Sequence, residues 1–270
     1  MRVRHQLGRK MTRTYLITGS ASGIGMATAD RLKTQGHTVI GADIAGADIN
    51  ADLTTVDGRA TLVSEAMSLS DGTIDAVLAV AGLALPIAKT IAVNYYGAIA
   101  TLTGLRPALA KSSSPRAVAV ASMASLFPQD EKLLTALLDG TEAEAMARAA
   151  ELEASGPELS GLIYGTSKRA LARWIRRNAA TADWAGASIA LNAIAPGVVL
   201  TPMTDVYTST PEAREAIMKR VPMPLNGIFQ PDAVASLLDW LSSEDNAHLC
   251  GQVIFIDGGS DVVIRGDSTF

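Results

Sequence analysis

The chain has 270 residues, of which 48% are hydrophobic and 19% are charged, so it can bury the core of one large α/β domain. Its formal net charge of −4 gives no reason to expect nucleic acid or an anionic membrane as a partner. The single cysteine excludes an intrachain disulfide and suits a reducing cytoplasm, where we expect the protein to reside. No apolar run approaches the roughly 18 residues that a membrane helix needs. The three histidines are dispersed and predict no metal site.

The first ten residues are basic and lack the apolar centre of a signal peptide. They are either an arm that touches an anionic partner, or a disordered extension that precedes the true start at Met11. We expect residues 1–11 to be a disordered extension and residues 12–270 to form a single domain.

A glycine-rich turn separates a predicted strand, residues 14–17, from a predicted helix, residues 26–35. The backbone N–H groups of such a turn, together with the helix N-terminus, favour an anion. Glycine-rich turns also serve as plain tight connections, but this context predicts nucleotide binding. The turn reads Thr18-Gly19-Ser20-Ala21-Ser22-Gly23-Ile24-Gly25.

An acidic residue ends the second predicted strand, residues 38–43. Asp43 stands roughly 20 residues past the glycine turn, where a carboxylate can accept hydrogen bonds from ribose hydroxyls and repel a 2′-phosphate. The alternative is an ordinary loop aspartate. Asp52 and Leu53 are predicted to end a short third strand and could contact an adenine ring.

Small and hydroxyl residues end two further predicted strands. Residues 74–82 finish with Ala81 and Gly82, which would let a ligand approach the backbone. Residues 116–122 finish with Ser122, whose hydroxyl could bind a substrate oxygen or could simply cap a turn. Between them, the predicted helix over residues 88–109 contains Asn94, which is either functional or a satisfied core amide.

A tyrosine and a lysine stand four residues apart on a predicted helix, residues 164–184, so Tyr164 and Lys168 share one face. A phenol has an ordinary pKa of about 10, and an adjacent cation lowers it. Such a pair can exchange a proton with an alcohol or carbonyl oxygen near neutral pH. The spacing alone also occurs by chance on many helices.

Two longer segments lie beside this helix in the sequence. Residues 129–159 are rich in Ala, Leu and Glu, and predict one or two inserted helices. This insertion must bury its leucines against the body of the protein, the substrate entrance or another subunit. Residues 203–229 follow the predicted strand 188–194 and are a candidate substrate lid. Their apolar side chains suggest an apolar substrate, although packing onto the body would require the same residues.

Alternating strands and helices predict a doubly wound, Rossmann-type parallel sheet flanked by helices. In family order, the chain resembles the short-chain dehydrogenase/reductase family over residues 12–270. The resemblance is carried by Thr18-Gly19-x-x-x-Gly23-x-Gly25, Asp43, Ala81-Gly82, Asn94, Ser122, Tyr164-x-x-x-Lys168, Pro196-Gly197 and Asp257-Gly258-Gly259. Within the family it is most similar to the bacterial NAD-dependent 3α-hydroxysteroid dehydrogenase/carbonyl reductase group.

The resemblance implies a catalytic role for four residues. Tyr164 would be the general acid/base, Lys168 would lower its pKa, Ser122 would hold the reacting oxygen, and Asn94 would support a water-linked proton path. The cofactor would be NAD, and its binding residues would be Gly19, Ser22, Gly23, Ile24, Gly25, Asp43, Asp52, Leu53, Ala81, Gly82, Tyr164, Lys168, Pro196, Gly197, Val199 and Thr201.

The implied reaction interconverts an alcohol and a ketone or aldehyde on an apolar cyclic or aromatic substrate. Aryl-alcohol dehydrogenases of the family share the outline, and a non-catalytic NAD sensor or a dehalogenase or epimerase on this scaffold are the rivals. The pair Ala79-Val80 departs from the Asn-Asn common in the family and removes a possible contact near the adenosine. We expect a homodimer or homotetramer, with the insertion obstructing the association through helices that is common in the family; the alternative is a flexible flap over the pocket.

Overall fold

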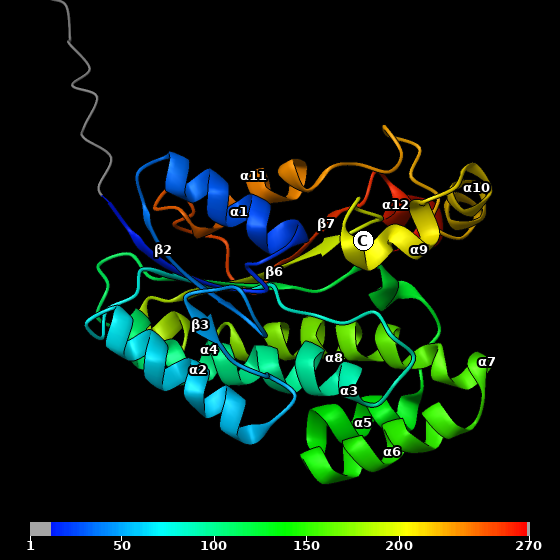
Figure 1. Cartoon of the computed structure of the whole chain (residues 1–270), viewed down its shortest axis with the longest axis horizontal. Coiled ribbons are helices and arrows are strands. Elements are labelled where there is room, and N and C mark those ends of the chain that lie inside the picture. The colour runs from blue at the N-terminus through cyan, green and yellow to red at the C-terminus, as the bar shows by residue number, and fades with distance from the viewer. Residues whose placement is uncertain (1–11, 269–270) are drawn as a thin grey trace, which may run out of the picture.

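A parallel sheet of seven strands forms the middle layer of the protein (Figure 1). The computed structural model describes residues 12–268, so the predicted N-terminal extension lies outside the described residues. The strand order is β3-β2-β1-β4-β5-β6-β7, which confirms the predicted doubly wound sheet with its reversal between β1 and β4. The strands are β1 (Thr14–Thr18), β2 (Thr38–Asp43), β3 (Ile49–Asn50), β4 (Ala76–Ala79), β5 (Arg116–Val120), β6 (Ala190–Pro196) and β7 (Val253–Ile256).

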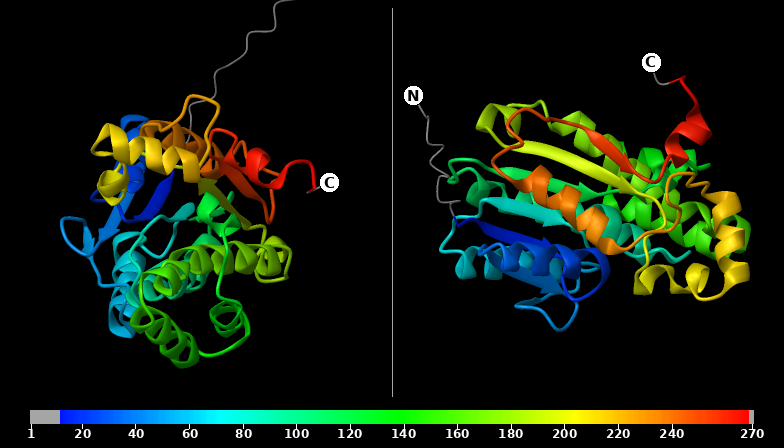
Figure 2. Two further views of the ribbon diagram at one scale, coloured as in Figure 1. Left: turned by 90° about the vertical axis from the view of Figure 1, so that its right-hand side faces the viewer. Right: turned by 90° about the horizontal axis from the view of Figure 1, so that it is seen from above.

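Helices cover both faces of the sheet, which is why the central strands are buried along their whole length. One face carries α1 (Gly23–Thr34) and α11 (Pro231–Ser242), and the other carries α2 (Val56–Leu69), α4 (Ala98–Leu109) and α8 (Leu162–Asn178) (Figures 1 and 2). Each face has its own apolar cluster, and the larger one lies beneath α2, α4 and α8. No helix among the described residues is both long and apolar enough to cross a bilayer.

Several predicted boundaries were wrong. The single helix expected over residues 88–109 is α3 (Lys89–Ile91), a π-helical turn η1 (Ala92–Gly97) and then α4. Such π turns are frequent at functional sites, and this one contains Asn94.

Two other predicted ends also differ. The helix expected over residues 164–184 starts earlier and ends earlier, as α8, and is followed by the 3₁₀ turn η3 (Ala185–Ala187). Asp52 and Leu53 do not end the third strand: they lie in the turn before α2, whose first turn is capped by the side chain of Thr55.

The insertion forms three helices, α5 (Glu131–Asp139), α6 (Glu142–Ala154) and α7 (Pro157–Ser160). Asp130 caps α5, and Thr141 with Glu144 forms a capping box on α6, so the sequence itself specifies both helix starts. The helices lie beside α8 at one end of the molecule (Figure 1). The leucines of α5 join the larger apolar cluster of the domain, so the insertion buries them against its own body: Leu133, Leu134 and Leu137 are at most 3% exposed.

The candidate lid lies at the same end of the molecule as the insertion but on the opposite side of the sheet plane (Figures 1 and 2). It contains η4 (Pro202–Thr204), α9 (Asp205–Thr208) and α10 (Pro211–Arg220). Val221 and Met223 are buried in a third apolar cluster, together with residues of η2 (Met123–Leu126), the turn that follows β5. Val206 and Tyr207 instead stay exposed. The last helix, α12 (Ser260–Arg265), follows β7.

Candidate active site

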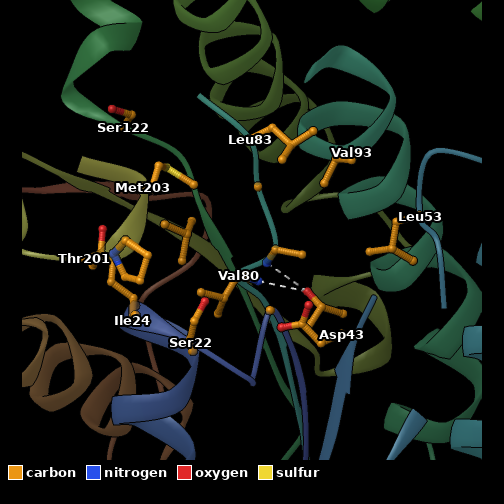
Figure 3. A pocket seen from close by; sticks show the side chains of 18 of the residues that line it. Ser22, Ile24, Asp43, Leu53, Val80, Leu83, Val93, Ser122, Thr201 and Met203 are labelled. Carbon is orange, nitrogen blue, oxygen red and sulfur yellow. Dashed lines mark hydrogen bonds between the residues drawn. The ribbon is translucent and has the colours of Figure 1, made fainter. Parts of the chain in front are cut away.

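A cavity of about 290 Å³ opens where the parallel strands end, which is where open α/β sheets bind ligands. Asp43 and Leu53 lie at one end of it and Ser122 lies at the other, with Thr201 and Met203 along one side (Figure 3). All the predicted cofactor-binding residues line this one cavity, and so does Ser122. Asn94 is the predicted site residue that does not line it. The cavity also uses residues that the sequence analysis did not assign to the site: Thr18, Leu83, Val93 and Thr204.

The glycine turn can pack closely because two of its positions, Gly19 and Gly25, have no side chain. Gly19 has a φ of +70°, and a Cβ there would lie 2.9 Å from the Ala81 Cα. A Cβ on Gly25 would lie 2.0 Å from the Gly19 carbonyl oxygen. The Thr18 hydroxyl accepts hydrogen bonds of 3.1 Å from the N–H groups of both Val80 and Ala81, which fasten the ends of β1 and β4 together.

The N-terminus of α1 points its unpaired donors at this turn. Ser22 occupies the N-cap position but makes no side-chain capping bond, and the first turn has no acidic residue. The first N–H groups of a helix need partners from outside it, and the helix dipole favours a negative charge there. This end of α1 is therefore suited to an anion.

Two aspartates, Asp43 and Asp52, line the predicted nucleotide end of the cavity, and both accept hydrogen bonds from backbone N–H groups. The Asp43 carboxylate accepts N–H bonds from Ala21 (3.0 Å) and Ile44 (2.7 Å). Asp52 accepts from both the N–H (2.9 Å) and the hydroxyl (2.7 Å) of Thr54, and these bonds lower the pKa of Asp52. Asp43 thus faces the glycine turn, whereas Asp52 shapes the turn that precedes α2.

Tyr164 and Lys168 lie in the first two turns of α8, at the end of the cavity opposite Asp43. Burial raises the pKa of Tyr164 and outweighs the opposite effect of a hydrogen bond from Ser122. The Ser122 hydroxyl also accepts the N–H of Ala124 at 3.1 Å, so it is both the cap of η2 and a neighbour of the phenol.

Lys168 is held by the backbone of β5. Its ammonium donates to the Val120 carbonyl at 2.7 Å, and it is not among the groups that shift the pKa of Tyr164. Burial lowers the pKa of Lys168 to about 8. In the protein without cofactor, burial of the phenol therefore sets the direction of the Tyr164 pKa shift, and the lowering of that pKa by Lys168 stays a prediction.

Asn94 is fully buried, and protein groups occupy its amide. Its Oδ1 accepts the Leu83 N–H at 2.8 Å, while Nδ2 donates to the Leu83 carbonyl at 2.9 Å and to the Ser167 hydroxyl at 3.0 Å. These bonds agree with the alternative of a satisfied core amide, while the part of Asn94 in a water-linked proton path stays a prediction. The amide joins the loop after β4 to α8, between Tyr164 and Lys168.

The loop after β6 rests on a methionine that the sequence analysis had assigned only to the lid. The Val198 N–H donates to the Met223 sulfur at 3.3 Å, and a Cβ on Gly197 would lie 2.8 Å from that sulfur. Asp257 also packs against Gly197, where the same Cβ would lie 3.0 Å from the Asp257 Cα, and it accepts the N–H groups of Gly259 and Asp261 at 3.0 and 2.7 Å. Met223 and Asp257 thus support the loop that carries Pro196 and Gly197. Nothing in the sequence alone indicates this supporting role of Met223.

Residues 12–268 contain no group of three or more His, Cys, Asp or Glu side chains able to hold a metal ion. The chemistry available is that of a phenol, a hydroxyl and an ammonium at one end of an elongated cavity. At the other end, helix N–H groups and a carboxylate suit a nucleotide.

Comparison with known proteins agrees with this arrangement. A short chain dehydrogenase family model matches residues 13–133, and an Enoyl-(Acyl carrier protein) reductase model matches residues 150–261. The 3-alpha-hydroxysteroid dehydrogenase/carbonyl reductase of Comamonas testosteroni is 36% identical over 253 residues, covering 93% of this chain and 97% of that protein. The 3-oxoacyl-(acyl-carrier-protein) reductase of Thermotoga maritima is 30% identical, covering 90% of this chain and 96% of that protein.

A solved structure is similar over nearly its whole length. The 3-alpha-hydroxysteroid dehydrogenase from Pseudomonas sp. B-0831, crystallised with NADH, has 37% sequence identity and a TM-score of 0.85. The match covers 94% of this chain and 99% of that one. The resemblance seen in the sequence is therefore confirmed, and the chain belongs to the short-chain dehydrogenase/reductase family of oxidoreductases.

Proposed function

We propose that the protein is an NAD-dependent oxidoreductase that interconverts a secondary alcohol and a ketone, or a primary alcohol and an aldehyde, on an apolar cyclic or aromatic substrate. The observation that carries the proposal is the placement of Ser122, Tyr164 and Lys168 at one end of a cavity whose other end presents Asp43. The names of the similar proteins from Comamonas testosteroni and Pseudomonas support the same class of reaction.

The residues of the cavity fit a dinucleotide. The uncapped first turn of α1 and the close-packed Gly19 and Gly25 would receive the pyrophosphate, and Asp43 would bind the adenosine ribose. Further contacts would come from the remaining proposed cofactor residues: Ser22, Gly23, Ile24, Asp52, Leu53, Ala81, Gly82, Tyr164, Lys168, Pro196, Gly197, Val199 and Thr201. When bound, the nicotinamide supplies hydride transfer.

The side chains of the protein manage the proton and the substrate oxygen. Because burial raises its pKa, the Tyr164 phenol stays protonated near neutral pH and can donate to a carbonyl oxygen as that oxygen gains charge. The Ser122 hydroxyl would hold the same oxygen by a second hydrogen bond. Lys168 would favour the phenolate in the oxidative direction, and Asn94 would keep the loop after β4 fixed to α8.

The apolar lid residues favour an apolar substrate. Met203 lines the cavity, while Val206 and Tyr207 stay 71% and 42% exposed nearby in the sequence, on α9. A flexible methionine adapts to varied shapes, so we expect broad specificity. An aryl-alcohol dehydrogenase remains the second candidate, because the same side chains would accept a single aromatic ring.

Replacing Tyr164 by Phe tests the reaction itself. The variant loses the proton donor but keeps the ring, so turnover should fall at least about 10²–10⁴-fold while NADH affinity stays close to wild type. Turnover is measured by the absorbance of the reduced cofactor, with a panel of steroid, aryl and aliphatic alcohols. Wild-type turnover in the Phe variant, or turnover of small charged hydroxy acids alone, would refute the proposal.

Asp43 should make the enzyme prefer NAD to NADP. A hydrogen bond to a charged group contributes about 1.5–3 kcal/mol, or roughly one to two decades in kcat/KM, before repulsion of the 2′-phosphate is added. Asp43→Asn should reduce this preference at least tenfold. As a control, Asp57→Asn removes an equal charge from the exposed first turn of α2 and should leave the ratio unchanged. Equal kcat/KM of the wild type for both cofactors would contradict the assignment.

Lys168 should make stability depend on pH. Its pKa is about 8 in the fold and 10.5 ordinarily, so between these values the folded protein binds fewer protons than the unfolded chain. The fold then gains stability as pH rises from about 8 to about 10.5, by at most about 3 kcal/mol, and the full penalty of burying the charge applies below pH 8.

Lys168→Met should remove that gain, as measured by urea unfolding without cofactor at several pH values in this window. The raised pKa values of the buried Tyr95 and the half-buried Tyr96 affect the stability of both proteins equally. They therefore cancel in the difference between the two free energies of unfolding. Loss of the hydrogen bond to Val120 shifts the free energy of unfolding equally at every pH, so it does not change how that free energy depends on pH. Parallel curves for the two proteins would show that Lys168 is not penalised by burial.

We further propose that the protein works in the cytoplasm as a homodimer. The insertion packs along α8, a helix through which members of this family commonly associate, so the usual four-helix contact would be obstructed. Light scattering of the purified protein should give the mass of two chains. The mass of four chains would contradict the dimer and leave the homotetramer.

A further inference from the structure

A buried arginine joins the insertion to the nucleotide end of the cavity. Arg59 of α2 is 7% exposed, and its Nη2 donates to both carboxylate oxygens of Glu142, each at 2.9 Å. Its guanidinium carbon lies 6.0 Å from the centre of the Tyr96 ring. Glu142 is the first residue of α6 and Tyr96 belongs to η1, so three separate elements meet at this one cation.

The first turn of α2, which carries Arg59, packs directly behind the cavity wall formed by Asp52, Leu53 and Thr54. The Arg59 N–H donates to the carbonyl of Thr55, and the Thr55 hydroxyl donates to the carbonyl of Asp52 at 3.0 Å. A Cβ on Gly58 would lie 2.0 Å from that Asp52 carbonyl oxygen, so the first turn of α2 packs against the wall without a gap.

The wall is also contacted by η1, the element that carries Tyr96. Gly97 follows Tyr96, and a Cβ on Gly97 would lie 3.0 Å from the Leu53 Cβ. Val93, three residues before Tyr96 on η1, lines the cavity itself. The wall is therefore enclosed by the start of α2 and by η1, and Arg59 contacts both.

Glu142 is the one carboxylate that pairs with Arg59 within residues 12–268. The Arg59 Nη1 is buried and has no hydrogen-bond partner there. A buried cation that loses its carboxylate is left as an uncompensated charge, so keeping it in the same position destabilises the fold. Glu142 in turn is favoured at the N-terminus of α6 by the helix dipole, which fixes the carboxylate where Arg59 needs it.

We propose that Arg59 and Glu142 are positioning residues for the adenosine half of the dinucleotide, through which the insertion braces the wall of Asp52, Leu53 and Thr54. The inference rests on the proposed function. It gives the insertion a part in cofactor affinity, separate from any part in substrate binding or assembly. Neither residue touches the cofactor itself.

The test is Glu142→Gln in the full-length protein, which keeps a hydrogen-bond acceptor but removes the charge. NADH binding is followed by fluorescence and ADP-ribose binding by competition, because ADP-ribose carries the adenosine half without the nicotinamide. Both affinities should weaken by about 2- to 30-fold. The kcat at saturating NAD and the KM for the alcohol should stay at wild-type values.

Asp139→Asn is the matched control. It removes one charge from the same insertion, where Asp139 pairs at 2.7 Å with the exposed Arg177 of α8 and not with Arg59. Its NADH and ADP-ribose affinities should equal those of the wild type. Equal losses in both variants would mean general loosening of the insertion and would overturn the inference.

A double variant covers the case in which Glu142→Gln does not fold. Arg59→Met with Glu142→Gln removes the stranded cation, so it should fold while its NADH affinity remains below wild type. Wild-type NADH affinity in a folded variant would overturn the inference alone, as would a change confined to the KM of the alcohol. Absence of NADH binding by the wild type would overturn the proposed function, and the inference with it.

Discussion

The close approach of the glycine turn to β4 is the constraint on which the cavity depends. With a side chain on Gly25, α1 could not sit over the Gly19 carbonyl, and with one on Gly19 the turn would strike Ala81. The Thr18 hydroxyl then fixes the two strand ends at this separation by binding Val80 and Ala81. Because strand order reverses between β1 and β4, their flanking helices lie on opposite faces, and the space above the strand ends stays open.

Burial sets the protonation of the reacting end. The same low-dielectric surroundings raise the pKa of Tyr164 and lower that of Lys168, so both shifts favour the neutral forms. With a pKa of about 8, however, Lys168 is still mostly charged at neutral pH while Tyr164 is a neutral phenol. The free protein thus holds a protonated phenol at the reacting end of the cavity, which is the proton donor that reduction of a carbonyl requires.

Sequence reasoning recovered the parts of this protein that depend on local pattern. Alternating apolar runs and glycine spacing predicted the sheet and the cavity, because strand ends of a parallel sheet converge whatever the side chains do. It could not predict the hydrogen-bond partners of individual side chains. That Lys168 turns to the Val120 carbonyl, and that the Asn94 amide is used by Leu83 and Ser167, depends on packing between elements distant in the chain. The helix ends were missed for a similar reason, since the π turn at Asn94 has no distinctive composition.

The insertion shows how added sequence can be absorbed without a second domain. Its capping signals are local and were readable, as in the pair Thr141 and Glu144, but its partners were not. Its leucines extend the apolar cluster beneath α8, and its ion pairs reach two helices outside it, α2 and α8. A short helix gains little stability by itself, so its position is set by these contacts. One contact ends on α8, which carries Tyr164, and another on α2, which begins at the nucleotide wall, so the insertion connects the two helices that border the two ends of the cavity.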